Sequence, residues 1–442
     1  MSDKHAFTRR QFLHTGLAML STVGSVPGFL PNAAAAMTDV DSLVKNKPGV
    51  PDDRVLVVVQ LSGGNDGLNT VIPFGMREYY NARPNIAVPE RDLLVVDPNT
   101  GIGLHPGLRD LYEMLGERRA TILQGVGYPN PNRSHFASMD VWHSGITDTS
   151  GSGQRGRGWI GRALDHARQN DITTDAHGME CITLGTTAPL ATLGRDVRPV
   201  TFQRPNLFRW HGGNQDETLT STYNQLLEQT SQSPRSASVG TPNGTPKEDD
   251  PAAFIFRTAL DAQVASTKVR QAVQQESKTR FPGGPLSSQL ETVAAMIRAE
   301  LPTRVYYVAL GGFDTHANQF GPHNNLLQQF AGSVRAFYRE LDATGHGHRV
   351  VTMAFSEFGR RVRQNASQGT DHGAAGPMFL FGDHARPGLL GDHPSMSNLE
   401  NGDITYNIDF RSVYRDVLEN WMKLNGDAAF ARTVQPAGIV HV

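Results

Sequence analysis

The sequence predicts an α/β protein with a mainly parallel central sheet and helices on both of its faces. Short apolar runs rich in β-branched residues alternate along the chain with segments of helical spacing. The first of these runs, Val55 to Leu61, is almost entirely apolar. An unbroken apolar run is typical of a strand that is buried on both faces, as in a parallel sheet. The alternation and the buried first strand together favour the α/β class.

The remaining elements follow from run length and from the spacing of apolar residues. In chain order we expect a strand over 55–61, a helix over 104–115, a strand over 120–124, a helix over 134–142, a helix over 286–301, a strand over 305–310, a helix over 323–341, a strand over 350–355, an apolar run over 378–381 and a helix over 410–424. No internal repeat interrupts this order.

The N-terminus predicts an exported protein. Thr8-Arg9-Arg10-Gln11-Phe12-Leu13 matches a twin-arginine motif, and a moderately apolar stretch follows over 16–30. Small residues then indicate cleavage near Ala35-Ala36, so that 1–36 is a signal peptide. We therefore expect the twin-arginine export machinery as a partner and a periplasmic or otherwise exported mature protein. A basic tail before a buried helix is the alternative.

The mature chain is predicted to hold one large domain. Residues 37–51 have the composition of a linker, and 52–442 form the single α/β domain. Within it, 207–289 is polar, with helical stretches and no strong strand, so we interpret it as a helical insertion that lies over the site as a lid. Residues 231–250 are rich in Ser, Pro, Gly and Thr, which indicates a flexible loop.

Composition excludes several classes of protein. The 442 residues are 38% hydrophobic and 19% charged with a net charge of -2, an ordinary composition for a soluble globular chain. A nucleic-acid-binding protein usually carries a strong basic face, so none is expected here. No apolar run is long enough for a permanent membrane span. With one cysteine, Cys181, the chain has no internal disulfide and no cysteine-based zinc site.

Small polar clusters follow or precede four of the apolar runs. The carboxyl ends of parallel strands lie along one edge of a sheet, so we expect the clusters to converge there. Carboxylates and imidazoles are ligands of divalent metals. The candidate metal ligands are Asp66, Asp314, His316, Glu357, Asp371 and His372. Asp314 and His316 share one face of an extended segment. Structural or solvated turns are the alternative for each cluster.

The segment Asn130 to Phe136 is the best candidate for a nucleophile. Ser134 is expected at a helix N-terminus, where backbone N–H groups and the helix dipole favour anions. Arg133 and His135 flank it as further catalytic candidates, whereas plain N-capping by Ser134 is the alternative. Of Arg360, Arg361 and Arg363, one turned inward would bind a phosphate or sulfate oxygen, and the others would form a solvated helix face.

Four sequence blocks resemble those of one family. They are Gly63 to Asn69, Tyr128 through Trp142, Gly312 to His316 and Ser356 to Arg360. Together they are similar to the exported domain-of-unknown-function 1501 family, which is grouped by fold with alkaline phosphatases and sulfatases. The resemblance implies a three-layer α/β/α sandwich of alkaline-phosphatase-like type with metal ligands at the strand ends.

The resemblance also implies roles for individual residues. In the wider superfamily an Asp follows the first strand and a nucleophile opens a later helix, which Asp66 and Ser134 match. Asp314 and His316 match a later pair, and His372 matches a downstream His. Ser356-Glu357-Phe358 departs from the pattern, because an Asp-His pair usually stands there.

Two functions are consistent with this sequence. The first is an exported metal-dependent hydrolase of phosphate or sulfate esters, with one or two divalent ions (Zn, Mn, Mg or Ca) and a small anionic ester as substrate. The second is an exported protein of the same fold that binds a metal or ligand without catalytic turnover. A shared fold does not decide between them.

Overall fold

The computed structural model describes residues 53–147, 156–170, 179–205 and 265–441. The contacts of the chain divide into two compact units, and the description here concerns the unit formed by 45–208 and 268–442. The predicted signal peptide, the linker and the flexible loop over 231–250 lie outside the described residues, as does most of the predicted insertion. In the described part of the chain, every helix is too short or too polar to cross a membrane.

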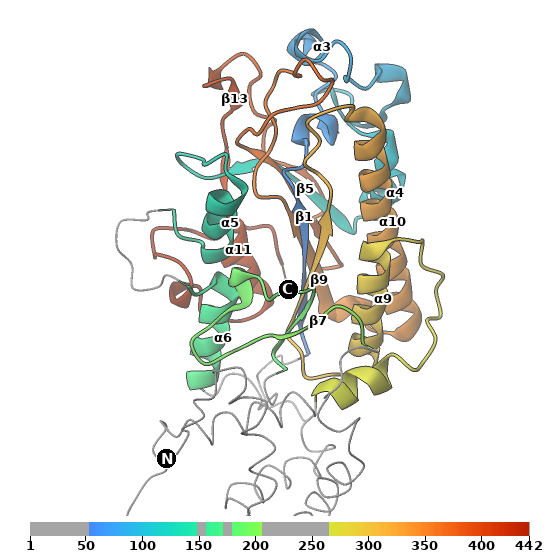
Figure 1. Cartoon of the computed structure of the whole chain (residues 1–442), viewed down its shortest axis with the longest axis vertical. Helices are drawn as coiled ribbons and strands as arrows, with labels where there is room; N and C mark the ends of the chain where they lie inside the picture. Colours follow the sequence, from blue (N-terminus) through green and yellow to red (C-terminus); the bar gives the residue numbers. More distant parts are fainter. Residues whose placement is uncertain (1–52, 148–155, 171–178, 206–264, 442) are drawn as a thin grey trace, which may run out of the picture. The chain divides into compact units, whose positions relative to one another are not determined.

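A nine-stranded sheet forms the centre of this unit (Figure 1). Its strands, in spatial order, are β11 (Gly388–Leu390), β5 (Ala120–Gly127), β10 (Gly376–Phe381), β9 (Val350–Phe355), β1 (Val55–Ser62), β8 (Val305–Gly311), β6 (Cys181–Leu184) and β7 (Val200–Phe202), with β14 (Ile408–Asp409) also paired to β5. All pairings are parallel except those of β10, which runs antiparallel to β5 and β9.

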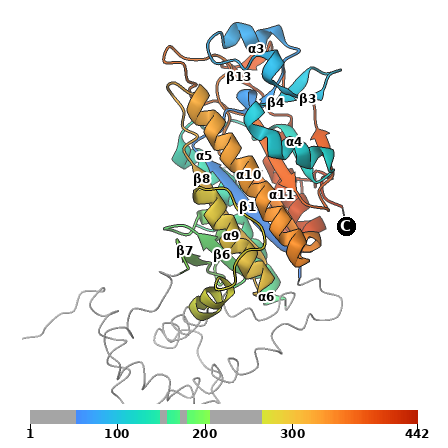
Figure 2. The same ribbon diagram turned by 90° about the vertical axis from the view of Figure 1, so that its right-hand side faces the viewer.

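Helices cover both faces of the sheet (Figure 1). One face is covered by α4 (Arg109–Gly116), α9 (Pro285–Arg298) and α10 (Phe320–Thr344), of which α9 and α10 run side by side (Figure 2). The other is covered by α5 (His135–Ser144), α6 (Trp159–Gln169) and α11 (Phe410–Asp416). Side chains of β1 alternate between the two cores, with Val57 in the first and Leu56 in the second. The predicted α/β/α class with a mainly parallel sheet is thereby confirmed.

Smaller elements connect these layers. A three-stranded sheet of β2 (Val71–Ile72), β3 (Leu94–Asp97) and β4 (Ile102–Leu104) follows β1, together with α3 (Arg77–Ala82). A two-stranded sheet of β12 (Leu399–Glu400) and β13 (Asp403–Ile404) precedes β14. Short 3₁₀ turns lie over Gly67–Asn69, Glu90–Asp92, Pro106–Leu108, Leu190–Thr192, Gly347–Arg349 and Gly426–Ala428.

Three predicted helices differ from the structure. The helix predicted over 104–115 begins only at Arg109, because Leu104 is in β4 and Pro106 opens a 3₁₀ turn. The helix predicted over 410–424 ends at Asp416 and continues as a π-helical turn, Val417–Trp421. The basic helix face at 360–363 does not exist, because these residues form a loop in which Arg360 is buried.

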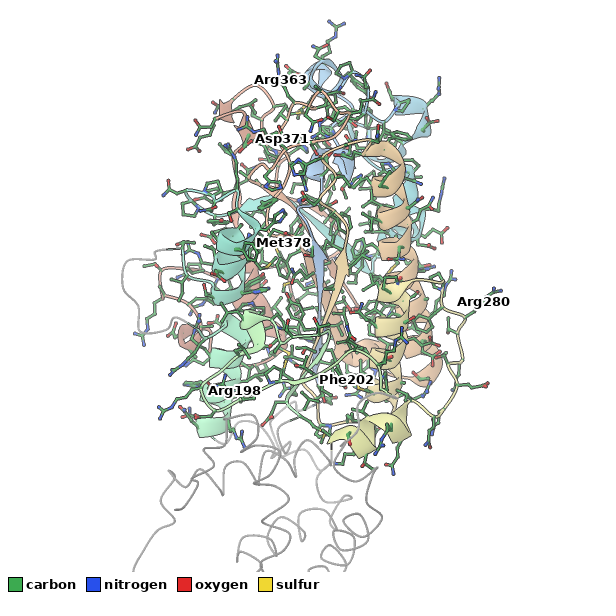
Figure 3. The ribbon with its side chains drawn as sticks, in the orientation of Figure 1. Arg198, Phe202, Arg280, Arg363, Asp371 and Met378 are labelled. Atoms are coloured by element: carbon green, nitrogen blue, oxygen red, sulfur yellow. The ribbon has the colours of Figure 1, made fainter. Side chains whose placement is uncertain are left out.

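The direction of β10 explains why the polar clusters meet. The loops after β1, β8 and β9 leave the same edge of the sheet, because these strands are parallel. Since β10 is antiparallel to β9, its beginning lies at that edge, and the residues that precede it join the others. Figure 3 labels Asp371 among these loops, beyond Met378 within the sheet.

Buried His143 on α5 predicts acid sensitivity of the fold. Its ring lies 3.1 Å from the Tyr307 hydroxyl, and burial lowers the pKa of His143 from 6.5 to about 4. Between these pH values His143 binds more protons in the unfolded chain than in the folded protein. Its contribution to the unfolding free energy is therefore fully present above pH 6.5 and is lost as the pH falls to about 4. His143→Gln should flatten this dependence by about 3 kcal/mol in unfolding free energy measured from pH 7 to 4. Parallel profiles for the two proteins would contradict the prediction.

Candidate metal centre

Three histidines and one aspartate converge at the edge of the sheet. The ligand atoms of His135, Asp314 and His372 lie within 4.8 Å of one another. His316 joins them, since its Nε2 lies 2.9 Å from Asp314 Oδ1 and 3.0 Å from His372 Nε2. The four side chains come from two loops and the start of α5, so that strand order assembles the cluster.

Each histidine of the cluster has an acceptor at its other ring nitrogen. His372 Nδ1 lies 2.7 Å from the carbonyl oxygen of Arg133, which only accepts hydrogen bonds. His135 Nδ1 lies 2.9 Å from Glu357 Oε1, and His316 Nδ1 lies 3.4 Å from Asp371 Oδ1. These partners favour the tautomer with a protonated Nδ1, so the three Nε2 atoms carry lone pairs.

The resulting group of acceptors fits a bound cation. The Nε2 atoms of His316 and His372 lie 3.0 Å from each other, and they lie 2.9 and 3.1 Å, respectively, from Asp314 Oδ1. Such a group of acceptors is stabilised by a metal ion, and a carboxylate or carbonyl at the outer nitrogen is the usual way in which metal-binding histidines are oriented. The cluster is therefore a possible metal site.

Arg360 is a buried residue that contacts the cluster through Asp314. Its guanidinium is buried and donates to the carbonyl oxygens of Gly63, Gly64, Phe313 and Thr370. Its Nη2 also lies 2.7 Å from Asp314 Oδ1. Partial burial acts to raise the pKa of Asp314, but the hydrogen bond from Arg360 and the charge of its guanidinium act against it, and the pKa is lowered to about 2. Asp314 is thus an anion at any physiological pH, and the donors of Arg360 are engaged within the protein.

Phe358 explains the departure from the Asp-His pattern. Its ring is buried and packs against those of His135 and His372, with centroids 5.0 and 4.7 Å apart. The residue after Glu357 thus packs against two imidazoles of the cluster rather than offering an imidazole of its own. Gly64, with a φ of +79°, leaves the space for this ring, because a Cβ there would overlap Phe358.

Asp66 does not lie in the cluster. It is fully buried, and its Oδ2 accepts from Arg83 at 2.6 Å and from Gln319 at 2.5 Å. Burial acts to raise the pKa of Asp66, but the charge of Arg83 outweighs it and the pKa is lowered. Neighbouring Asn65 bonds to His323, and Asn69 accepts from Arg83. The glycine-rich segment after β1 therefore anchors a buried polar network beside the site.

The other predicted residues lie at the border of the cluster. Glu357 and Asp371 contact imidazole Nδ1 atoms, as described, and so orient rings rather than join the Nε2 atoms. Ser134 is exposed and occupies the N-cap position of α5, but its hydroxyl makes no hydrogen bond to the first turn of the helix. Arg133 pairs with Asp403 at 2.5 Å. The structure thus brings all the predicted site residues to one edge and places all of them except Asp66 in the cluster or next to it, while their roles as ligands or catalysts stay predictions.

Two residues next to the site were missed by sequence reasoning. Arg83 lies 17 positions after its partner Asp66, and Asp403 lies 270 positions after Arg133. Neither stands beside a strand end or in a motif of metal-ligand spacing. The Ala-Arg-Pro and Gly-Asp contexts of these residues resemble ordinary surface turns, so no local signal distinguishes them.

Glu357→Gln tests the orienting role of this carboxylate. Glu357 is 1% exposed and also accepts from the backbone N–H of Gly63 at 2.8 Å. The amide keeps the size of the side chain but weakens its bond to His135, so metal affinity should fall about 10- to 100-fold. Competition with a chelator measures this change, and Glu300→Gln, on an exposed carboxylate outside the cluster, is the control. Unchanged affinity would assign Glu357 a purely structural role.

The fold and the cluster define an α/β sandwich protein with a histidine- and aspartate-rich centre at the carboxyl edge of its sheet. The chain belongs to the family described as "Protein of unknown function (DUF1501)", whose model matches residues 53–431. No curated protein matches the sequence.

Solved structures with a similar arrangement are distant. They include the lipoteichoic acid synthase LtaP of Listeria monocytogenes, with 10% identity, 84% of this chain and 79% of that chain covered, and a TM-score of 0.33. The PsFucS1 sulfatase of Pseudoalteromonas sp. has 8% identity, coverage of 94% and 78%, and a TM-score of 0.34. The phosphonate monoester hydrolase SpPMH of Silicibacter pomeroyi has 9% identity, coverage of 84% and 74%, and a TM-score of 0.31. We therefore base the functional proposal on the geometry of the site.

Proposed function

We propose that this protein is an exported metal-dependent hydrolase of phosphate or sulfate esters. One observation carries the proposal: three histidines, each held at Nδ1 by an acceptor, present Nε2 atoms beside the ionised Asp314. Imidazoles whose outer nitrogens are held by acceptors, gathered around a carboxylate, are the usual arrangement of metal-binding histidines. The same constellation is what an open catalytic metal site requires.

The ligand set favours one transition-metal ion. Imidazole nitrogens suit zinc and its neighbours, whereas magnesium and calcium prefer sites built from oxygen. His135, His316, His372 and Asp314 would hold the ion. Within the described residues a single group of side chains has this geometry, which favours one ion over two.

The residues around the cluster suit the chemistry of an ester with anionic oxygens. A bound divalent ion supplies a Lewis acid that polarises the ester and lowers the pKa of a coordinated hydroxyl group. Ser134 stands immediately before His135 and is the candidate nucleophile. The first-turn N–H groups of α5 have no acceptor within the helix and are suited to the non-bridging oxygens. Arg360 does not reach for the substrate, because its donors bind the protein itself.

Metal analysis combined with ester hydrolysis tests this function. The protein purified without chelator should contain about one equivalent of zinc, manganese or a related ion. It should hydrolyse an aryl phosphate or aryl sulfate, and chelation should remove the activity. A protein without bound metal that stays inactive after addition of Zn, Mn, Mg or Ca would contradict the proposal.

A metal-dependent binding protein without turnover is the second candidate. Phe358 favours it, because this residue offers no ligand where an Asp-His pair usually stands in the wider superfamily. Ser134→Ala and Asp314→Ala distinguish the two functions. A ligand-binding or cellular phenotype that survives the first substitution but not the second would favour binding, whereas loss of hydrolysis in both favours catalysis.

Export is part of the proposal and rests on the N-terminal sequence. Arg9 and Arg10 lie in the twin-arginine motif. Replacement of both by Lys should leave the full-length protein in the cytoplasm of its producing cell, as measured by cell fractionation. Unchanged export would exclude the twin-arginine route.

A further inference from the structure

A pocket of about 630 Å³ adjoins the metal centre. It is lined by residues 127–133, by Ala374 and Ala375, and by 400–401 and 403–406. Arg133 belongs to both places, because its carbonyl oxygen accepts from His372 while its side chain lines the pocket. The volume is in the range of small-molecule binding sites. A ligand in the pocket would therefore lie directly beside the cluster.

Asp403 gives the pocket an unused acceptor. The residue is 2% exposed, and its Oδ2 accepts from Arg133 Nε at 2.9 Å and from Nη2 at 2.5 Å. Its Oδ1 is buried and has no hydrogen-bond partner within the described part of the chain. A buried carboxylate oxygen without a donor is costly. Burial also raises the pKa of Asp403 in spite of the neighbouring Arg133. A donor from a ligand would remove this cost.

The lining indicates a neutral ligand with several hydroxyl groups. Arg133 already balances the charge of Asp403, so a cationic amine at the free oxygen would meet the guanidinium. Glu400, the other carboxylate of the lining, is exposed to solvent. The side-chain amides of Asn132 and Asn401 both donate and accept, as hydroxyl groups do. The ring of Tyr406 is 37% exposed at the pocket and offers a flat apolar surface for the C–H groups of a sugar ring.

We propose that this pocket binds a sugar unit and that Asp403 Oδ1 accepts a hydrogen bond from one of its hydroxyl groups. In the hydrolase reaction the sugar would be the alcohol portion of the ester, next to the metal centre. That reaction role rests on the proposed function, whereas the binding of the sugar does not.

Binding of neutral sugars to the metal-free full chain tests the proposal. The probes are methyl glycosides of common hexoses, with ethanolamine and inorganic phosphate as charged comparisons, followed by ligand-observed NMR and calorimetry. At least one glycoside should bind saturably. Asp403→Asn and Tyr406→Ala should each weaken it about tenfold or more, because the first replaces the charged acceptor by a neutral amide and the second removes the aromatic surface. Phe320→Ala, at an exposed aromatic residue outside the pocket, should leave binding unchanged.

The outcomes separate the pocket from the hydrolase. Absence of glycoside binding, or glycoside binding that neither substitution changes, would overturn the inference. Asp403-dependent binding of ethanolamine alone would overturn it as well. If the Asp403→Asn variant does not fold, the result for Tyr406→Ala decides between these outcomes. Sugar binding by a protein that hydrolyses no ester would support the sugar pocket and contradict the hydrolase function. Hydrolysis of aryl esters without sugar binding would support the hydrolase function and contradict the sugar pocket.

Discussion

Asp314→Ala should release the metal and abolish hydrolysis. Asp314 Oδ1 lies 2.9 Å from His316 Nε2 and 3.1 Å from His372 Nε2, so it is the one carboxylate that contacts these two rings where their lone pairs converge. Its loss removes the only anionic group of the proposed ligand set and leaves Arg360 without its carboxylate partner. Metal content should fall from about one equivalent to below a tenth, and the hydrolytic rate by about a hundredfold or more.

A matched control separates this effect from a general loss of surface charge. The side chain of Asp314 is 48% exposed, and that of Asp92, far from the cluster in sequence, is 49% exposed. Asp92→Ala should therefore keep both metal and activity. Asp314→Asn, which retains an oxygen for Arg360, should still lose most of the metal. Full metal content in Asp314→Ala would show that the histidines alone form the site, or that no metal binds there.

The fold was predictable because its strands are buried on both faces. The runs of β1, β8 and β9 are apolar except for single polar residues such as Gln60 and Thr352, and the structure ends them within one residue of the predicted positions. The antiparallel direction of β10 was not predictable, because its short apolar run carries no information about orientation. Its consequence is large, since Asp371 and His372 reach the site only because β10 begins at that edge.

The sequence predicted which residues lie near one another in the site but not which role each of them has. Strand ends bring carboxylates and imidazoles to one edge whatever the side chains do there. Whether Glu357 meets a metal or the Nδ1 of His135 depends on the position of the imidazole ring, which Phe358 fixes by packing. Asp66 is engaged by Arg83 through a contact that spans 17 positions and crosses β2 and α3, so its inward direction has no local sequence signal.

Arg83→Met should destabilise the whole domain. Arg83 and Asp66 are both fully buried, so removal of the guanidinium leaves an uncompensated buried carboxylate. Loss of one partner of a buried pair costs about 3–5 kcal/mol of unfolding free energy. Arg83 also donates to the carbonyl oxygens of Arg361 at 2.9 Å and Val362 at 3.0 Å, which adjoin Arg360. The substitution should therefore weaken metal binding in addition to stability.

Denaturant unfolding with two comparison variants measures this cost. Glu117→Gln breaks an ion pair in which the carboxylate is 45% exposed, and it should cost about 1 kcal/mol or less. The double variant Asp66→Leu with Arg83→Met removes both charges and should recover a large part of the loss, because no unpaired charge remains. If Arg83→Met costs no more than Glu117→Gln, the buried pair is not what holds the loop after β1 against the loop of Arg360. If the double variant recovers stability but not metal affinity, the hydrogen bonds of Arg83 to the 361–362 backbone, rather than its charge, position the metal centre.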